Sequence, residues 1–148
     1  MELARRMPEA DFWVAGPGDA VEDCPANLRL LGVVADQKEL ARLYSQADLS
    51  VVVSRRETFS MPCAESLCCG TPVVGFRAGA PEQIALPQYS EFVAFGDLDG
   101  LEAVVRNWLG RKTDRSEIAA AGAETYSAET MIRNFMEAYR RLLWKQRR

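Results

Sequence analysis

The chain has 148 residues, 48% of them hydrophobic, which is enough for one substantial core and close to the usual size of a single domain. Its formal net charge of -3 comes from 18 basic and 21 acidic residues mixed along the sequence, which argues against a nucleic-acid platform. The sequence has no histidine, so it lacks the commonest general base and the commonest zinc ligand.

Short apolar or β-branched runs predict five strands along the chain. They lie at Phe12–Ala15, Leu28–Gly32, Leu49–Val53, Pro72–Phe76 and Glu91–Phe95. Several are too continuously apolar for a sheet with one wet face, and they favour parallel strands covered on both sides.

Helical patterns lie between these strands. The clearest begins at Asp36 and Glu39, which have capping-box spacing. Another is expected from about Met61 to Cys69, with Gly70 as a left-handed cap.

After the last strand the pattern is helical throughout. It predicts a helix around Leu101–Trp108, a short one at Ile118–Ala123 and a longer one starting near Ser127. The whole chain, residues 1–148, therefore reads as a single α/β domain with a helical C-terminal extension from about residue 98. The expected fold is a Rossmann-like parallel sheet with helices on both faces.

Two further features bear on the compartment. No run of about 18 apolar residues occurs and the N-terminus lacks the order of a signal peptide, so we expect a cytoplasmic protein. The cysteines Cys24, Cys63, Cys68 and Cys69 show neither paired-ligand nor disulfide spacing, and we expect them to be reduced and mostly buried.

The segment from Ser54 to Glu65 carries the most chemical information. It leaves the carboxyl end of a predicted strand, where ligands bind in open α/β sheets, and enters a helix. Ser60 suits the helix cap and Pro62 its first turn. The backbone N–H groups of Phe59 to Cys63 are then free to face an anionic or hydroxyl-rich ligand.

Two carboxylates belong to this segment. Helical side chains lean toward the N-terminus, so Glu65 can reach back toward Glu57. Carboxylates accept hydrogen bonds from vicinal diols, which suits Glu65 to a ribose and Glu57 to sugar hydroxyls. The alternative is that Glu57 is a solvated loop charge and Glu65 complements the helix dipole.

Several separate motifs keep a recognisable order and spacing. They are Leu30-Leu31-Gly32, Leu40 to Asp48, Ser54-x-x-Glu57-x-Phe59, Ala64 to Val74 and Gly79-Ala80-Pro81-Glu82. Over about residues 10 to 110 this order resembles the C-terminal, donor-binding half of retaining GT-B glycosyltransferases of family 4. Among these, it resembles bacterial exopolysaccharide enzymes such as colanic acid glycosyltransferases.

The resemblance implies roles for individual residues. Glu57 would contact the donor sugar and Glu65 the ribose, while the backbone of Thr58, Phe59, Ser60 and Met61 would face the sugar and diphosphate. Val33 and Val34 fall where the family's main chain meets the base. Ser60 stands where the family usually has glycine, and Ala80 where it often has a second one.

The resemblance also implies what this chain lacks. In the family, the C-terminal half begins with a strand that carries an arginine and a nearby lysine for the donor diphosphate. The resemblance implies that this chain starts in the helix after that strand, at Glu2 to Met7. The family's N-terminal half binds the acceptor. Without that first strand, we expect Phe12–Ala15 to pair directly with Leu49–Val53, or a partner chain to fill the gap. We also expect weak donor binding and no activity from the isolated chain.

The leading hypothesis is a donor-binding half of an enzyme that transfers a hexose from a UDP- or GDP-sugar to a saccharide or lipid-linked acceptor with retention. No metal or other cofactor is expected. One alternative is a non-catalytic, truncated nucleotide-sugar-binding module. Another is an unrelated doubly wound domain that binds no nucleotide.

Other signals have structural explanations that we favour. Asp97-Leu98-Asp99 resembles an acidic metal motif but precedes a helix, where aspartates cap, and Gly16-Pro17-Gly18 suits a turn. Trp108 and Trp144 are interpreted as packing residues. Solvent exposure is favoured for Arg55, Arg56 and Arg77, whose alternative is to replace the missing cations. It is also favoured over weak contact with the inner membrane face for Arg140, Arg141, Lys145, Arg147 and Arg148.

Overall fold

The computed structural model describes residues 1–18 and 22–145. The strands are β1 (Phe12–Ala15), β2 (Leu28–Gly32), β3 (Ser50–Val52), β4 (Val73–Phe76) and β5 (Ser90–Val93). The helices are α1 (Glu2–Arg6), α2 (Gln37–Gln46), α3 (Met61–Cys68), α4 (Pro81–Ile84), the 3-10 turn η1 (Pro87–Tyr89), α5 (Leu98–Leu109), α6 (Arg115–Tyr126) and α7 (Ala128–Lys145). The five predicted strands and the α/β fold class are confirmed, although α4 and η1 were not foreseen.

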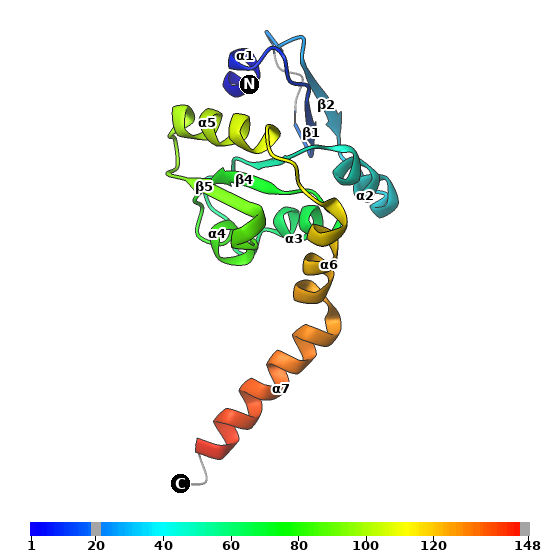
Figure 1. The fold of residues 1–148 in the computed structure, drawn as a ribbon, viewed down its shortest axis with the longest axis vertical. Helices are drawn as coiled ribbons and strands as arrows, with labels where there is room; N and C mark the ends of the chain where they lie inside the picture. Colours follow the sequence, from blue (N-terminus) through cyan, green and yellow to red (C-terminus); the bar gives the residue numbers. More distant parts are fainter. Residues whose placement is uncertain (19–21, 146–148) are drawn as a thin grey trace.

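Strands β3, β4 and β5 form a parallel sheet with β4 in the middle, and helices cover both of its faces. Val74 and Phe76 of β4 pack with α1 and α5 in one core, whereas Val73 packs with α3 and α6 in the other. Figure 1 shows α5 on one side of this sheet and α3 on the other. Successive side chains of β4 therefore point into two different cores, which explains why its sequence is continuously apolar.

Strands β1 and β2 form a separate two-stranded parallel sheet. The expected direct pairing of β1 with β3 is therefore wrong. Residues 1–10 contain helix α1 and no strand, so they do not complete the sheet either. Trp13, Val14 and Leu30 stay 42–45% exposed, because no described helix covers them. Filling of this edge by a partner chain stays a prediction.

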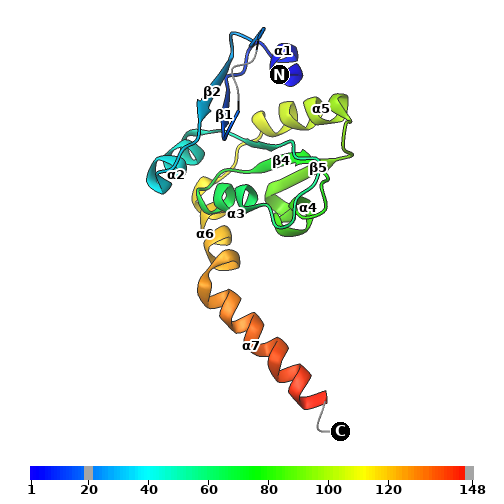
Figure 2. The same cartoon turned by 180° about the vertical axis from the view of Figure 1, so that it is seen from behind.

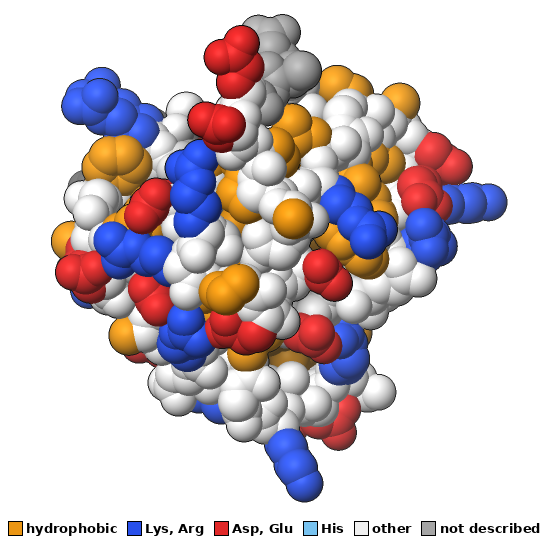
Figure 3. Space-filling model, turned by 90° about the horizontal axis from the view of Figure 1, so that it is seen from above, with side chains coloured by type: hydrophobic (Ala, Val, Ile, Leu, Met, Phe, Trp, Pro, Cys, Tyr) orange, Lys and Arg blue, Asp and Glu red, His pale blue; other side chains and the backbone are white. Residues whose placement is uncertain are grey.

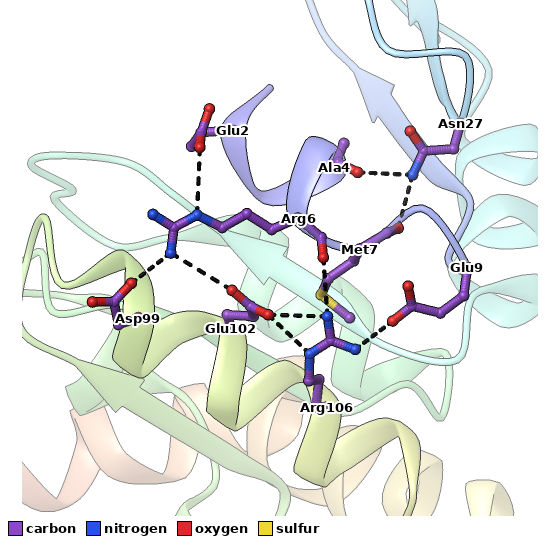
Figure 4. Close-up of polar contacts among 9 residues, drawn as sticks. All are labelled: Glu2, Ala4, Arg6, Met7, Glu9, Asn27, Asp99, Glu102 and Arg106. Atoms are coloured by element: carbon purple, nitrogen blue, oxygen red, sulfur yellow. Dashed lines mark hydrogen bonds and ion pairs between the residues drawn. The ribbon is translucent and has the colours of Figure 1, made fainter.

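The β1–β2 unit is fastened to the rest of the molecule through α1. Arg6 pairs with Asp99 and Glu102 of α5, and Arg106 of α5 pairs with Glu9 (Figure 4). Leu3 and Met7, on α1 and directly after it, are buried in the core that α5 shares with β4. Since these ion pairs are exposed, the apolar contacts supply most of the attachment.

Asn27 anchors the start of β2 to the same region. Its side-chain amide donates to the carbonyls of Ala4, Met7 and Ala10 at 2.8–3.0 Å. One side-chain amide thus links the end of α1 to the turn that leads into β1, in addition to the backbone hydrogen bonds that the carbonyls of Ala4 and Met7 already accept.

Helix α7 extends away from the body, as Figures 1 and 2 show. Its apolar side is uncovered by the described residues. The side chains that stay 48–62% exposed are Met131, Ile132, Phe135, Met136, Tyr139, Leu142, Leu143 and Trp144. The packing interpretation is confirmed for Trp108, which is 5% exposed, whereas Trp144 is 60% exposed and does not belong to either core.

Several expectations from composition can be compared with the surface. Acidic and basic side chains are interspersed over the face drawn in Figure 3, without a single-sign patch. All four cysteines are free, but the expectation that they are mostly buried is wrong, because Cys63 is buried, Cys69 is half-buried, and Cys24 and Cys68 are exposed. Among the described residues, no helix combines the length and apolar character needed to cross a membrane.

Candidate functional site

The segment after β3 turns into α3 through an unusual residue. Ser60 precedes the helix with φ 66° and ψ 66°, the left-handed conformation that favours glycine, and its side chain is buried. The expected side-chain cap is wrong, because its hydroxyl lies 3.2 Å from Cys63 Sγ instead. Burial raises the pKa of the Cys63 thiol, as does the nearby charge of Glu57, so the thiol stays neutral and suits this contact.

The backbone amides at this turn are only partly available. The N–H of Cys63 donates to the carbonyl of Ser60 at 3.0 Å, so its expected freedom is wrong. Within the described chain, the amides of Thr58, Phe59, Ser60 and Met61 have no acceptor. These groups can donate to an anion or a hydroxyl at the start of α3.

Glu57 is half-buried in the loop that leads to this turn. Its carboxylate accepts a hydrogen bond from the hydroxyl of Ser54 at 2.7 Å, and its backbone N–H donates to the carbonyl of Ala78 at 3.1 Å. The first contact orients the carboxylate, and the second ties the loop after β3 to the loop after β4. The interpretation as a freely solvated loop charge therefore does not describe this residue.

Glu65 lies on the second turn of α3 and is also half-buried. The phenol of Tyr44 on α2 donates to its carboxylate at 3.3 Å. Burial raises the pKa of Tyr44, and the charges of Glu65 and Cys63 raise it further. Tyr44 is therefore neutral and can keep donating at any ordinary pH.

No hydrogen bond joins the two glutamates. Glu57 lies in the loop between β3 and α3, three residues before Ser60, and Glu65 lies on the second turn of α3. Both therefore belong to the segment that enters and begins this helix. Their lone pairs beyond those used by Ser54 and Tyr44 remain able to accept hydrogen bonds from hydroxyl groups.

The residues expected near a base lie at the end of β2. Gly32 ends that strand with φ 68°, and Val33 and Val34 follow it. Val33 is 70% exposed and Val34 half-buried, so the main chain here is accessible. The contact between α2, which follows these residues, and α3 links this end of β2 to the helix that carries Glu65.

The loop after β4 contributes a residue that sequence reasoning left without a role. The carboxylate of Glu82 accepts hydrogen bonds from the amides of Ala78 and Gly79 at 3.0–3.2 Å. Burial raises its pKa, but hydrogen bonds from its own backbone and from these two amides, with the charge of Arg77, lower it overall. Glu82 therefore shapes this loop, and Ala80 has φ −93°, so it needs no glycine.

The acidic motif after β5 has structural roles. The Asp97 carboxylate accepts from the amide of Gly100 at 2.9 Å and caps α5, which confirms the capping interpretation. Asp99 pairs with Arg6. Among the described residues, no group of three or more cysteine, aspartate or glutamate side chains is arranged to hold a metal ion.

An aromatic contact at the same edge of the sheet was not foreseen. The guanidinium of Arg55 lies over the ring of Phe95, 6.0 Å from its centroid, and Phe95 meets Phe76 edge-on at 5.4 Å. Phe95 is nevertheless 50% exposed. The only hint in the sequence was its place as the last residue of the predicted strand Glu91–Phe95.

Comparison with known proteins identifies relatives of this arrangement. Residues 1–111 match the family model described as glycosyl transferases group 1. The D-inositol 3-phosphate glycosyltransferase of Thermomonospora curvata is 30% identical over 142 residues, which cover 85% of this chain and 33% of that protein. The MMP alpha-(1->4)-mannosyltransferase of Mycolicibacterium hassiacum is 38% identical over 79 residues, 52% of this chain and 18% of that protein.

Solved structures agree with the fold. The crystal structure of AviGT4, a glycosyltransferase of avilamycin A biosynthesis, has a TM-score of 0.70 at 24% identity and covers 95% of this chain and 45% of its own. The crystal structure of HepE from Anabaena in complex with UDP has a TM-score of 0.66 at 15% identity, and the match covers 93% of this chain and 52% of the HepE chain. The chain thus spans a third or less of these curated relatives and about half of these solved chains.

Proposed function

The chain belongs to the group 1 glycosyl transferases, and on this premise we propose that it is the donor-binding half of a hexosyltransferase. The observation that carries the proposal is the pair of half-buried carboxylates of Glu57 and Glu65 near the start of α3. Each carboxylate accepts one hydrogen bond from a hydroxyl group of the protein, which orients it. Carboxylates held in this way can accept hydrogen bonds from the hydroxyls of a ribose and a sugar. The free amides of Thr58 to Met61 suit the phosphates between them.

In the proposed complex, Glu65 holds the ribose and Glu57 the donor sugar, with Val33 and Val34 beside the base. The donor is a UDP- or GDP-sugar, and UDP is the nucleotide bound in the similar HepE structure. Transfer to a saccharide or lipid-linked acceptor proceeds with retention and without a metal or other cofactor. The mannosyl- and inositol-phosphate-directed relatives support sugar transfer as the reaction class.

We propose that this chain alone is inactive and binds its donor weakly. A helix N-terminus contributes roughly 0.3 to 2 kcal/mol toward an anion, whereas millimolar affinity requires about 4 kcal/mol. Transfer also requires an acceptor held against the donor with water excluded. The proposed partner is an acceptor-binding N-terminal half, which would hold the acceptor against the donor and exclude water.

We further propose a cytoplasmic enzyme whose α7 makes weak contact with an anionic membrane surface. The exposed apolar side of α7 is accompanied by the exposed Arg140 and Arg141. The cluster continues in the sequence with Lys145, whose side chain lies outside the described structure, and with Arg147 and Arg148, which lie outside the described residues. Co-sedimentation with phosphatidylglycerol vesicles, absent with phosphatidylcholine vesicles, is the expected result; equal recovery with both contradicts it.

Calorimetric titration with UDP, GDP and ADP tests the donor site. We expect UDP or GDP to bind, and Glu65→Gln to weaken that binding about 10-fold or more, because a charge-assisted hydrogen bond is lost. Glu124→Gln is the matched control, since Glu124 is an exposed carboxylate on α6 without a side-chain partner. Equal affinities for wild type and Glu65→Gln would contradict the assignment.

A further inference from the structure

The described arginines fall into two groups, those whose side chains have a hydrogen-bond or ion-pair partner within the protein and those whose side chains have none. Arg6, Arg42 and Arg106, for example, pair with carboxylates. Among the described residues, the arginines with neither a hydrogen bond nor an ion pair from their side chains are Arg29, Arg55, Arg56, Arg77 and Arg140. Three of these five follow β3 or β4, at the carboxyl edge of the three-stranded sheet.

Arg55 has a defined position at that edge. It follows β3, and Phe95, over which it lies, follows β5. Because β4 runs between these strands, the contact passes across the carboxyl end of β4, where Phe76 supports the Phe95 ring. An aromatic ring occupies one face of the guanidinium and leaves its N–H edges able to donate.

The carboxylates near this edge are already engaged. Glu57 accepts from Ser54, Glu82 accepts from the amides of the loop after β4, and Asp97 caps α5. None of them forms an ion pair with Arg55. The edge therefore holds a positioned cation whose donors have no partner inside the protein, in the place where ligands bind to open parallel sheets.

We propose that Arg55, seated on Phe95, binds a phosphate group of the substrates. This inference rests on the proposed function and adds a residue to it. The planar fork of a guanidinium matches two phosphate oxygens, and stacking on the ring reduces the flexibility lost on binding. Arg77 contributes less, because its charge already acts on Glu82.

The phosphate can belong to the donor diphosphate or to a phosphorylated acceptor, and inorganic pyrophosphate serves as a probe for both. In the ¹⁵N-labelled chain, pyrophosphate should shift the side-chain Nε–Hε signal of Arg55. Arg55→Gln should weaken pyrophosphate binding about 5-fold or more through loss of charge-assisted hydrogen bonds. Lys112→Gln, which removes an exposed charge after α5, should change it less than about 2-fold.

A second titration separates the sources. UDP or GDP added to the pyrophosphate-bound chain displaces the probe if Arg55 serves the donor, and binds beside it if Arg55 serves the acceptor; either result supports the site. An unmoved Arg55 signal, or equal weakening by Lys112→Gln, overturns it. If Arg55→Gln weakens pyrophosphate binding while Glu65→Gln leaves UDP and GDP binding unchanged, the donor proposal fails and the phosphate site stands. If Glu65→Gln weakens nucleotide binding while Arg55→Gln leaves pyrophosphate binding unchanged, only the phosphate site is rejected.

Discussion

The phenol of Tyr44 donates a hydrogen bond to the carboxylate of Glu65, and this contact ties α2 to the helix that begins at the candidate site. Tyr44 is 27 residues before Thr71, whose hydroxyl in turn donates to the Tyr44 carbonyl at 2.6 Å. The position of the carboxylate is thus set by two elements that are distant in sequence.

Tyr44→Phe should weaken nucleotide binding without unfolding the chain. The variant removes one donor to Glu65 and leaves the ring in place, so we expect a loss of about 1 kcal/mol in binding, or roughly 5-fold in Kd. Titration with UDP or GDP measures it. An unchanged Kd would show that Tyr44 does not position Glu65 for the ligand.

Ser60 allows a test of backbone strain at the start of α3. A left-handed residue with a side chain costs about 1 kcal/mol, so Ser60→Gly removes strain, whereas Ser60→Ala keeps it and loses the contact with Cys63. We expect the glycine variant to be about 1 kcal/mol more stable than the alanine variant in urea unfolding. Equal stability of the two variants would contradict the left-handed geometry.

Gly75 lies where β4 passes β3 without room for a side chain. A Cβ at this position would be 2.1 Å from the carbonyl oxygen of Val52, so Gly75→Ala must displace a strand. We expect a loss of several kcal/mol, on the order of 3. Gly18→Ala is the control, because nothing lies within 4 Å of its Cβ; the two midpoints of thermal unfolding should differ clearly.

Glu82 should make the fold sensitive to acid. Its pKa is lowered in the folded chain, so its stabilising contribution is present above the unfolded-state pKa and is lost as the pH falls through the folded-state value. We expect Glu82→Gln to be less stable than wild type at about pH 7 and closer to it at about pH 3.5. Urea unfolding at both pH values measures the gap, and a constant gap would contradict the assignment.

Removal of residues 128–148 should leave the body folded. The described part of α7 contacts α6, and its apolar side chains are exposed, so the two cores lose little on truncation. We expect an unfolding free energy within about 1 kcal/mol of the full chain and less self-association in analytical ultracentrifugation. A collapse of the unfolding transition would show that α7 is part of the core.

Local features of the fold could be predicted from the sequence. The apolar runs predicted both ends of β1 and β2 correctly, and Gly70, with φ 79°, follows the end of α3 as expected. Part of the capping box was wrong, because Asp36 caps α2 but Glu39 pairs with Arg42. Capping-box spacing shows that Glu39 could bond the backbone at the start of α2, but it does not show that the side chain of Arg42 competes for the same carboxylate.

Long-range features could not be predicted. The apolar spacing of α7 indicates which side is apolar, but not whether another element covers it. The separation of β1 from β3 depends on how α1 packs against α5, which no strand pattern reports. In the site, the hydroxyl of Ser54 on Glu57 and the ring of Phe95 under Arg55 arise from loop geometry that sequence spacing does not contain.

The most direct test of the central claim is a ¹H–¹⁵N titration of the whole chain with UDP and with GDP. One nucleotide should shift the amide signals of Thr58 to Met61 and of Glu65 together, with a single affinity that Glu65→Gln reduces. Signals that stay unmoved around the start of α3, or shifts confined to another part of the chain, would contradict a nucleotide site at these two carboxylates.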